Sequence, residues 1–360
     1  MKIVIFAGGA GTRLWPLSRK KTPKQFDPMF EGKSTLQLAG ERIRKLVDWN
    51  DVYISTLDQY ESIVRQQLPD IPDENIITEP ARRDVAPAIG LAMLKLRDVG
   101  KEPVAILWSD HLMDRPESFR RGLSVAEGLI RKDPERFIFF GERPRYAEQN
   151  LGWIHIGPVR QKIKSIPVRS FRGWFYRPPL AKCKKMFASR QWIWNPGYWV
   201  TTPDFVLEQF RLKQPAMYRQ LQLIGQALGT SREGKVLKRV YPQLEKIHFD
   251  NAILEKMKPS QAVVLQLDMG WSDPGTLYAI KEALAAQADD NVTRGAVLPF
   301  NSRDCLLFND EPKKLLAAVG LEGIIVVETK DALLVVHKDR VPEVKKMVES
   351  LEHTKWSHLL

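Results

Sequence analysis

The chain has 360 residues, 44% of them hydrophobic, and a formal net charge of +12 at pH 7. The length leaves room for two domains, and the composition is that of a folded globular protein rather than a disordered one. The longest apolar runs fall far short of the roughly 20 residues that a membrane helix needs.

The apolar run after Lys2 is too short to be the core of a signal peptide, so a cytoplasmic protein is expected. Cys183 and Cys305 are too few for a disulfide framework or a zinc site. The positive charge favours anionic ligands in general, and it does not choose between nucleotides, sugar phosphates and nucleic acids.

The first stretch combines a buried strand with a glycine-rich loop. Residues 3–6 are apolar without alternation, which is typical of a strand buried on both faces of a parallel sheet. Glycines in the following segment 7–11 leave room for a phosphate and can turn amide N–H groups toward it. A dinucleotide fingerprint is excluded because Leu14 stands at the third glycine position, and a P-loop is excluded because Thr12-Arg13 follows Gly11.

Apolar strands and amphipathic helices then alternate as far as residue 140, which predicts a Rossmann-like, mostly parallel α/β sheet with helices on both faces. In such sheets ligands bind beyond the carboxyl ends of the strands. The glycine loop and Asp110, which follows the strand 104–108, are expected at that edge, and Asp110 is a candidate Mg²⁺ ligand. The expected helices cover 36–47, 60–68, 86–99 and 116–132, and the other strands cover 52–56, 76–78 and 138–140.

The alternation fades after Leu151, where residues 151–157 suit a strand. Residues 160–190 then mix Arg and Lys with Phe171, Trp174, Phe175 and Tyr176, a pattern that single-stranded nucleic-acid binding also produces. The apolar strand 262–267 precedes a second glycine-containing segment, 270–275, which carries Asp273. Asp110 and Asp273 together would supply the hard oxygen ligands that Mg²⁺ prefers.

A helix over 276–288 closes the large domain. Short apolar segments then recur about every ten residues, which predicts a small stacked β domain followed by a closing helix over 341–352. We therefore predict a catalytic domain over 1–290 and a C-terminal β domain over 291–360.

The segment AGGAGTRLWPLSRKKTPKQF, residues 7–26, resembles the signature of sugar-1-phosphate nucleotidyltransferases, and most closely that of the mannose-1-phosphate guanylyltransferases. EPARRDVAPA at 79–88 resembles the family's EPxxRxTAPA, and GWSDPG at 270–275 resembles its GWSDVG. FDNAILEK at 249–256 resembles the helix start S-x-D-x-A-[VI]-[LM]-E. The chain departs from the family at Val85, at Pro196, and at Tyr176-Arg177-Pro178, where relatives carry Glu-Lys-Pro.

The resemblance implies a role for each matched residue. Arg13, Lys24, Asp110 and Asp273 are implied to be catalytic, with Mg²⁺ held by Asp110 and Asp273. The sugar phosphate is implied to contact Gly152, Arg177, Asn195 and Asp250. The nucleotide is implied to contact Ala7, Gly8, Gly9, Gly11, Thr12, Arg13, Lys24, Glu79, Arg83, Pro87, Ser109 and Asp110.

The implied reaction joins GTP and mannose 1-phosphate to give GDP-mannose and pyrophosphate. The resemblance also implies a short left-handed β-helix that often mediates dimer contacts, and no fused isomerase domain is expected. Neither a nucleic acid nor a membrane is expected as a partner. Three alternatives stay open: the same chemistry with another sugar 1-phosphate or nucleotide, a silent sensor of nucleotide sugars, and a nucleic-acid binder using residues 160–190.

Overall fold

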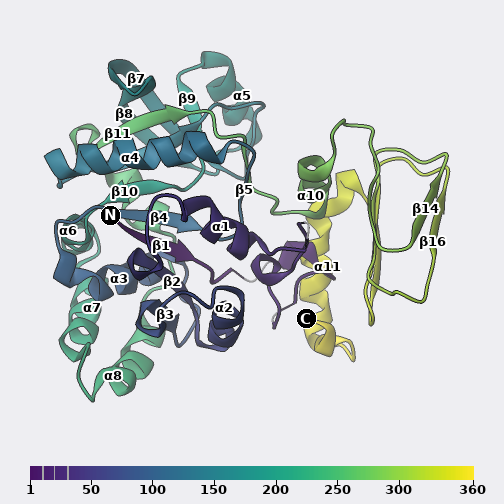
Figure 1. Ribbon diagram of the computed structural model, residues 1–360, viewed down its shortest axis with the longest axis horizontal. Helices are drawn as coiled ribbons and strands as arrows, with labels where there is room; N and C mark the ends of the chain where they lie inside the picture. Colours follow the sequence, from purple (N-terminus) through teal and green to yellow (C-terminus); the bar gives the residue numbers. More distant parts are fainter. Residues whose placement is uncertain (10–11, 20, 31) are drawn as a thin grey trace. The chain divides into compact units, whose positions relative to one another are not determined.

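The computed structural model describes residues 1–9, 12–19, 21–30 and 32–360 (Figure 1). The chain forms two compact units, which are described separately. Unit 1 contains residues 1–8, 39–109 and 113–271, and unit 2 contains residues 9–38, 110–112 and 272–360.

Unit 1 is built on a ten-stranded sheet in the order β11-β8-β7-β9-β6-β10-β4-β1-β2-β3. Strands β3, β2, β1 and β4 pair in parallel, and β6 and β11 pair in parallel with each other. Strand β10 is antiparallel to both β4 and β6, so these six strands all run in one direction. The mostly parallel sheet is therefore confirmed. Its strands are β1 (Lys2–Phe6), β2 (Val52–Leu57), β3 (Ile76–Glu79), β4 (Val104–Trp108), β6 (Phe137–Glu142), β7 (Gly152–Ile163), β8 (Ile166–Tyr176), β9 (Trp192–Asn195), β10 (Trp199–Thr201) and β11 (Ala262–Leu267).

Helices cover both faces of this sheet. Successive strand residues point to opposite sides, and apolar side chains on both sides pack against helices. Phe139 belongs to the apolar cluster that α3, α6 and α7 share with the strands, whereas the neighbouring Phe140 lies 5.7 Å from the ring of Phe119 on α4. The helices of unit 1 are α2 (Glu61–Gln67), α3 (Val85–Lys95), α4 (Pro116–Lys132), α5 (Leu180–Ser189), α6 (Pro203–Lys213), α7 (Pro215–Ala227), α8 (Glu233–Val240) and α9 (Phe249–Ala252); α1 (Thr35–Ile43) runs from one unit into the other.

Unit 2 contains short strands stacked in parallel, as a β-helix requires. Strands β13 (Val292–Arg294), β15 (Leu306–Asn309) and β17 (Ile324–Glu328) form one parallel sheet, which β18 (Leu333–His337) closes in antiparallel fashion. Strands β14 (Val297–Phe300) and β16 (Leu316–Val319) form a second parallel sheet. The predicted stacked β domain is confirmed.

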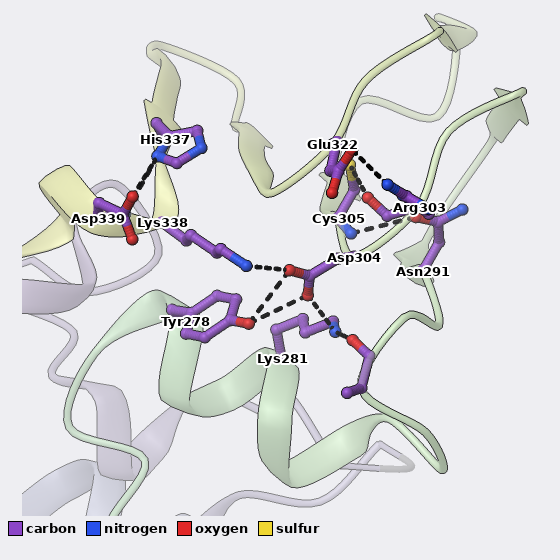
Figure 2. A network of polar contacts seen from close by, with 11 residues as sticks. Tyr278, Lys281, Asn291, Arg303, Asp304, Cys305, Glu322, His337, Lys338 and Asp339 are labelled. Carbon is purple, nitrogen blue, oxygen red and sulfur yellow. Dashed lines mark hydrogen bonds and ion pairs between the residues drawn. The ribbon is translucent and has the colours of Figure 1, made fainter.

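Two helices and the N-terminal segment complete unit 2. Helices α10 (Leu277–Leu284) and α11 (Val344–Ser350) share an apolar cluster with Leu14 and Trp15 and with Phe308 of β15. The indole Nε1 of Trp15 donates to the carbonyl of Leu359 at 2.9 Å. Next to this core, Asp304 accepts hydrogen bonds from three side chains of α10 and of the segment after β18 (Figure 2).

The predicted and observed elements differ mainly in where the helices begin and end. Strands β4 and β11 and helix α4 have the predicted bounds, whereas α10 ends four residues early, at Leu284. The closing helix begins as a 3-10 segment, Lys338–Glu343, which contains Pro342 and so lacks one backbone donor. Among the described residues, no helix combines the length and the apolar character that crossing a bilayer demands.

The basic and aromatic stretch 160–190 forms a hairpin of β7 and β8 followed by α5. Phe171 and Trp174 are buried in the core cluster rather than displayed. These two rings cannot stack on nucleobases, whereas Phe175 and Tyr176 are half-buried, so the feature that favoured single-stranded nucleic-acid binding is weakened.

Candidate functional site

A lysine and two aspartates meet in unit 2. Lys24 begins the 3-10 segment η2 (Lys24–Phe26) and is 8% exposed. Its Nζ lies 2.8 Å from Oδ2 of Asp110 and 3.5 Å from Oδ1 of Asp273. Three of the four residues that the sequence marks as catalytic are therefore in contact.

His111 joins this cluster. Its Nε2 lies 3.7 Å from Oδ1 of Asp110, and ligand atoms of Asp110, His111 and Asp273 lie within 4.8 Å of one another. Two carboxylates with open positions around them suit a hard divalent cation such as Mg²⁺. The donor set therefore fits a divalent metal.

The charges in this cluster stabilise one another. Burial alone would raise the pKa of the Asp110 carboxyl, but the Lys24 ammonium and the neighbouring His111 lower it to about 2. Burial alone would lower the pKa of Lys24, but Asp110 and Asp273 raise it above its usual value. The Asp110 carboxylate and the Lys24 ammonium therefore favour their charged forms, which are the states that can bind cations and phosphates.

The glycine loop is only partly covered by the described residues. A Cβ placed on Gly9 would meet no atom of the described residues within 4 Å, and the Gly9 carbonyl accepts a hydrogen bond from Nε2 of Gln25 at 3.0 Å. Gly11 lies outside the described residues, and Thr12 begins the 3-10 segment η1 (Thr12–Leu14). The Arg13 side chain is exposed, which is the condition a phosphate-binding cation needs.

In unit 1, the loop after β3 carries the residues expected to contact the nucleotide. Glu79 ends β3 and is 6% exposed, and its Oε2 accepts a hydrogen bond from the Tyr241 hydroxyl at 2.5 Å. Burial raises the pKa of Glu79 to about 7, although Tyr241 and Arg82 oppose the shift. The Nε of Arg83 is buried and has no hydrogen-bond partner among the described residues.

The remaining nucleotide candidates of unit 1 lie at strand ends. The Ser109 amide donates to the Phe6 carbonyl at 3.1 Å, and the Ala7 amide donates to the Ser55 carbonyl at 2.7 Å. A Cβ on Gly8 would lie 3.7 Å from Oε1 of Glu79, so this glycine is close to the loop after β3. Pro87 is buried in the first turn of α3. Ala7, Gly8 and Ser109 thus gather at the carboxyl ends of β1 and β4.

The predicted sugar-phosphate residues also come together in unit 1. Gly152 of β7 pairs directly with Asn195 of β9, and a Cβ on Gly152 would lie 3.3 Å from the Asn195 side chain. Asp250 accepts a hydrogen bond from the Trp174 indole at 3.2 Å, and burial raises its pKa to about 6. Arg177 follows β8, is exposed, and lowers the pKa of Asp250 through its charge.

Three residues of these clusters are absent from the sequence prediction. His111 follows Asp110 directly, and that adjacency was its only signal. Tyr241 is 162 positions from Glu79, so no local pattern reveals their contact. His248 stands where the family pattern has serine, and its Nε2 lies 3.3 Å from Oδ1 of Asp84 and 3.4 Å from the Tyr176 hydroxyl.

Comparison with known proteins decides the family. A model described as nucleotidyl transferase matches residues 2–290. The chain belongs to the nucleotidyl transferase family. A second model, described as MannoseP isomerase/GMP-like beta-helix domain, matches residues 295–351, in agreement with the stacked strands of unit 2.

Relatives of this nucleotidyl transferase align along nearly its whole length. It is 31% identical to a mannose-1-phosphate guanylyltransferase of Klebsiella pneumoniae, over 98% of this chain and 74% of the relative. It is 32% identical to the alginate biosynthesis protein AlgA of Pseudomonas aeruginosa, over 97% of this chain and 72% of the relative. A crystal structure from Thermus thermophilus, described as a mannose-1-phosphate geranyltransferase, aligns over 98% of this chain and 99% of that one, with a TM-score of 0.85 and 28% identity.

Proposed function

We propose that this nucleotidyl transferase transfers GMP from GTP to mannose 1-phosphate, giving GDP-mannose and pyrophosphate. The main structural support for this proposal is the contact of Lys24 with Asp110 and Asp273. This contact places a buried cation between two carboxylates from distant parts of the chain. The family membership and the names of the relatives support the same reaction.

The chemistry needs charge stabilisation rather than a general base. A sugar 1-phosphate oxygen is already anionic at neutral pH, so it can attack the α-phosphorus without losing a proton. The difficulty is repulsion between two anions, which fixed cations relieve by orientation and electrostatic stabilisation. In this proposal Lys24 and the exposed Arg13 bind the triphosphate and the departing pyrophosphate.

Asp110 and Asp273 would hold a divalent cation, and we propose Mg²⁺ because their oxygens are hard ligands. When bound, this ion would neutralise phosphate charge and favour in-line displacement. Asp110 contributes an ionised carboxylate at neutral pH, since its pKa is lowered to about 2.

We assign the phosphates to the glycine loop, the base and ribose to the segment of Glu79, Arg83 and Pro87, and a further nucleotide contact to Ser109. Glu79 has a carboxylate oxygen close to Gly8, and the buried Arg83 Nε is a donor that no described residue accepts from. The sugar phosphate is assigned to Gly152, Arg177, Asn195 and Asp250. Arg177 can grip a phosphate with two parallel hydrogen bonds, which the lysine of relatives cannot do.

Three further features belong to the proposal. We place the reaction in the cytoplasm, where nucleoside triphosphates are available. A homodimer would form through the C-terminal domain, and the predicted domain boundary between residues 290 and 291 is kept as part of this proposal.

Pyrophosphate release, measured with Mg²⁺ over a grid of nucleoside triphosphates and sugar 1-phosphates, tests the function. Turnover is expected with GTP and mannose 1-phosphate. Lys24→Met and Asp273→Asn should each lower kcat/KM by about 10²-fold or more, because each removes a charge that faces the phosphates. Asp331→Asn is the matched control, since Asp331 is an exposed partner of Arg19 in the same unit.

Each other outcome has a defined meaning. Turnover with a different pair would keep the mechanism and change the substrates, which the departures at Arg177 and Pro196 make worth testing. An inactive protein that binds GDP-mannose would instead support a sensor.

A further inference from the structure

The positive charge of this chain is concentrated in one segment. Residues 149–203 contain ten Lys or Arg and neither Asp nor Glu, whereas the other 305 residues carry 45 Lys or Arg against 43 Asp or Glu. Ten of the twelve net charges therefore lie in about one seventh of the chain. A charge excess of this kind acts on partners rather than on the fold.

All ten Lys and Arg of this segment lie within residues 152–190, which form one end of unit 1 and which we call the basic lobe. It contains β7, β8 and α5, which stand along the upper edge of the unit in Figure 1. Apart from Arg177, which we assign to the sugar phosphate, it has eight exposed cations: Arg160, Lys162, Lys164, Arg172, Lys182, Lys184, Lys185 and Arg190.

These cations are not neutralised within the protein. Within the described ranges, none of the eight makes an ion pair with a carboxylate, and Arg160 donates instead to the Ser170 hydroxyl at 2.8 Å. Elsewhere on the surface exposed arginines do pair, as Arg211 does with Glu208 and Arg303 with Glu322. The basic lobe therefore presents an uncompensated positive surface.

Apolar side chains are exposed among these cations. On α5, Leu180, Lys184 and Phe187 follow one another at helical spacing on the outer side, while Cys183 and Met186 are buried beneath. Leu180 and Phe187 are 43% and 39% exposed, and Val159 on β7 is also exposed. At a membrane surface such apolar side chains can enter the interface while the neighbouring lysines contact anionic headgroups.

We propose that the basic lobe docks reversibly on the surface of an anionic lipid bilayer. Phosphate headgroups complement the eight unpaired cations, and Leu180 and Phe187 enter the boundary between headgroups and acyl chains. Nucleic acid fits less well, because Phe171 and Trp174 are buried and the half-buried rings of Phe175 and Tyr176 are already in contact with Lys182 and His248. The docking is peripheral and leaves the fold unchanged.

Co-sedimentation of the full chain with vesicles tests this docking. Vesicles of phosphatidylcholine with 30% phosphatidylglycerol should bind the protein at 100 mM salt and release it at 500 mM salt, because the attraction is electrostatic. Vesicles of pure phosphatidylcholine should bind at least tenfold less. Lys184→Gln with Lys185→Gln should weaken binding to the anionic vesicles about tenfold or more.

Matched variants separate the lobe from general charge. Lys235→Gln with Lys238→Gln removes two exposed lysines from α8 of the same unit and should leave vesicle binding unchanged. Pyrophosphate release should be unchanged in both double variants, since none of these lysines is assigned to the substrates. Equal losses in the two double variants would overturn the proposal by showing only a general charge effect.

A second comparison separates lipid from other polyanions. Phe187→Ser should weaken vesicle binding severalfold, since only a bilayer offers an apolar interior to this side chain. Tighter binding to a single-stranded or duplex 20-mer oligonucleotide than to anionic vesicles, unaffected by Phe187→Ser, would overturn the membrane proposal in favour of nucleic acid. An absence of binding to any vesicle would also overturn it.

Discussion

Two carboxylates of the proposed site are held at opposite ends of the carboxyl pKa range. Asp110 faces the Lys24 ammonium at 2.8 Å, and its pKa is lowered to about 2 although burial opposes the shift. Glu79 is buried beside a neutral tyrosine, and its pKa is raised to about 7. The difference arises because a buried carboxylate stays ionised only where a cation compensates for the lost hydration. The Asp110 carboxylate is thus suited to bind a metal ion, and the Glu79 carboxyl is suited to form hydrogen bonds.

Glu79 makes stability depend on pH in a direction that can be worked out. Its folded pKa lies above its unfolded value of 4.5, so between pH 4.5 and 7 the folded protein binds more protons than the unfolded chain. Stability therefore falls as pH rises through this window, by up to about 3 kcal/mol at 1.36 kcal/mol per pKa unit. Glu79→Gln removes this ionisation and should be more stable than the parent at pH 8, with a much smaller difference at pH 4.5.

Urea unfolding of both proteins at the two pH values measures this effect, and Tyr241→Phe provides the companion variant. Removing the hydroxyl that stabilises ionised Glu79 should steepen the loss of stability with pH, whereas Glu79→Gln should flatten it. A stability difference between parent and Glu79→Gln that is the same at both pH values would show that the carboxyl does not titrate in this window.

At the scale of elements, Asp304 ties helix α10 to the β-helix strands of unit 2 (Figure 2). Its carboxylate pairs with Lys281 and with Lys338, the latter at 2.6 Å, and accepts a hydrogen bond from the Tyr278 hydroxyl at 3.1 Å. Lys281 is 1% exposed, so its ammonium has exchanged water for this carboxylate and for the Ala288 carbonyl. The network therefore fixes α10 against the start of β15.

Asp304→Asn should lower the free energy of unfolding of unit 2 by about 3–5 kcal/mol, because it leaves the buried Lys281 charge without a carboxylate. Asparagine keeps the shape and tolerates the positive φ of 53° at this position, so the loss reports charge rather than backbone strain. Glu322→Gln is the control in the same domain: Glu322 and Arg303 are both 62% exposed, and losing such a surface pair should cost less than about 1 kcal/mol. Thermal unfolding followed by circular dichroism compares the two, and equal small shifts would show that water already solvates Lys281.

Regular elements were the most predictable part of this structure. Strand β4 and helix α4 have their predicted bounds, because continuous apolar runs and a proline in the first turn are local signals. The hairpin of β7 and β8 was predicted only in part, because residues 151–157 of β7 were expected as a strand and β8 was not. Its aromatic residues are buried against distant elements, such as Trp174 against Asp250, and no local pattern records such contacts.

The candidate site shows the same division. The sequence motifs identified Lys24, Asp110 and Asp273 as candidate site residues. The structure brings these three side chains together within unit 2. Tyr241 gave no signal because its contact with Glu79 joins residues far apart in sequence. The roles of the site residues remain proposals that the variants above test.

At the scale of the whole molecule, unit 2 presents an apolar surface that the fold itself does not use. In the sheet of β14 and β16, Phe300 lies opposite Val319 in register, and the two are 58% and 66% exposed. Leu298 on the same face is also exposed. Contiguous apolar surface of this kind usually marks an interaction site, and it supports the proposed homodimer through the C-terminal domain.

If the proposed homodimer forms through this face, Phe300→Glu together with Val319→Glu should convert it into monomers in sedimentation equilibrium at micromolar concentration. The reason is that two carboxylates per subunit would have to leave water for an apolar interface, where no cation in this sheet compensates them. Both positions are exposed in the isolated chain, so the variant should fold and keep its melting temperature as a monomer. Leu223→Glu on α7, a position 51% exposed in unit 1, controls for added charge and should leave the dimer intact. A parent protein that sediments as a monomer, or a dimer that survives the double substitution, would exclude this face as the interface between two copies of the chain.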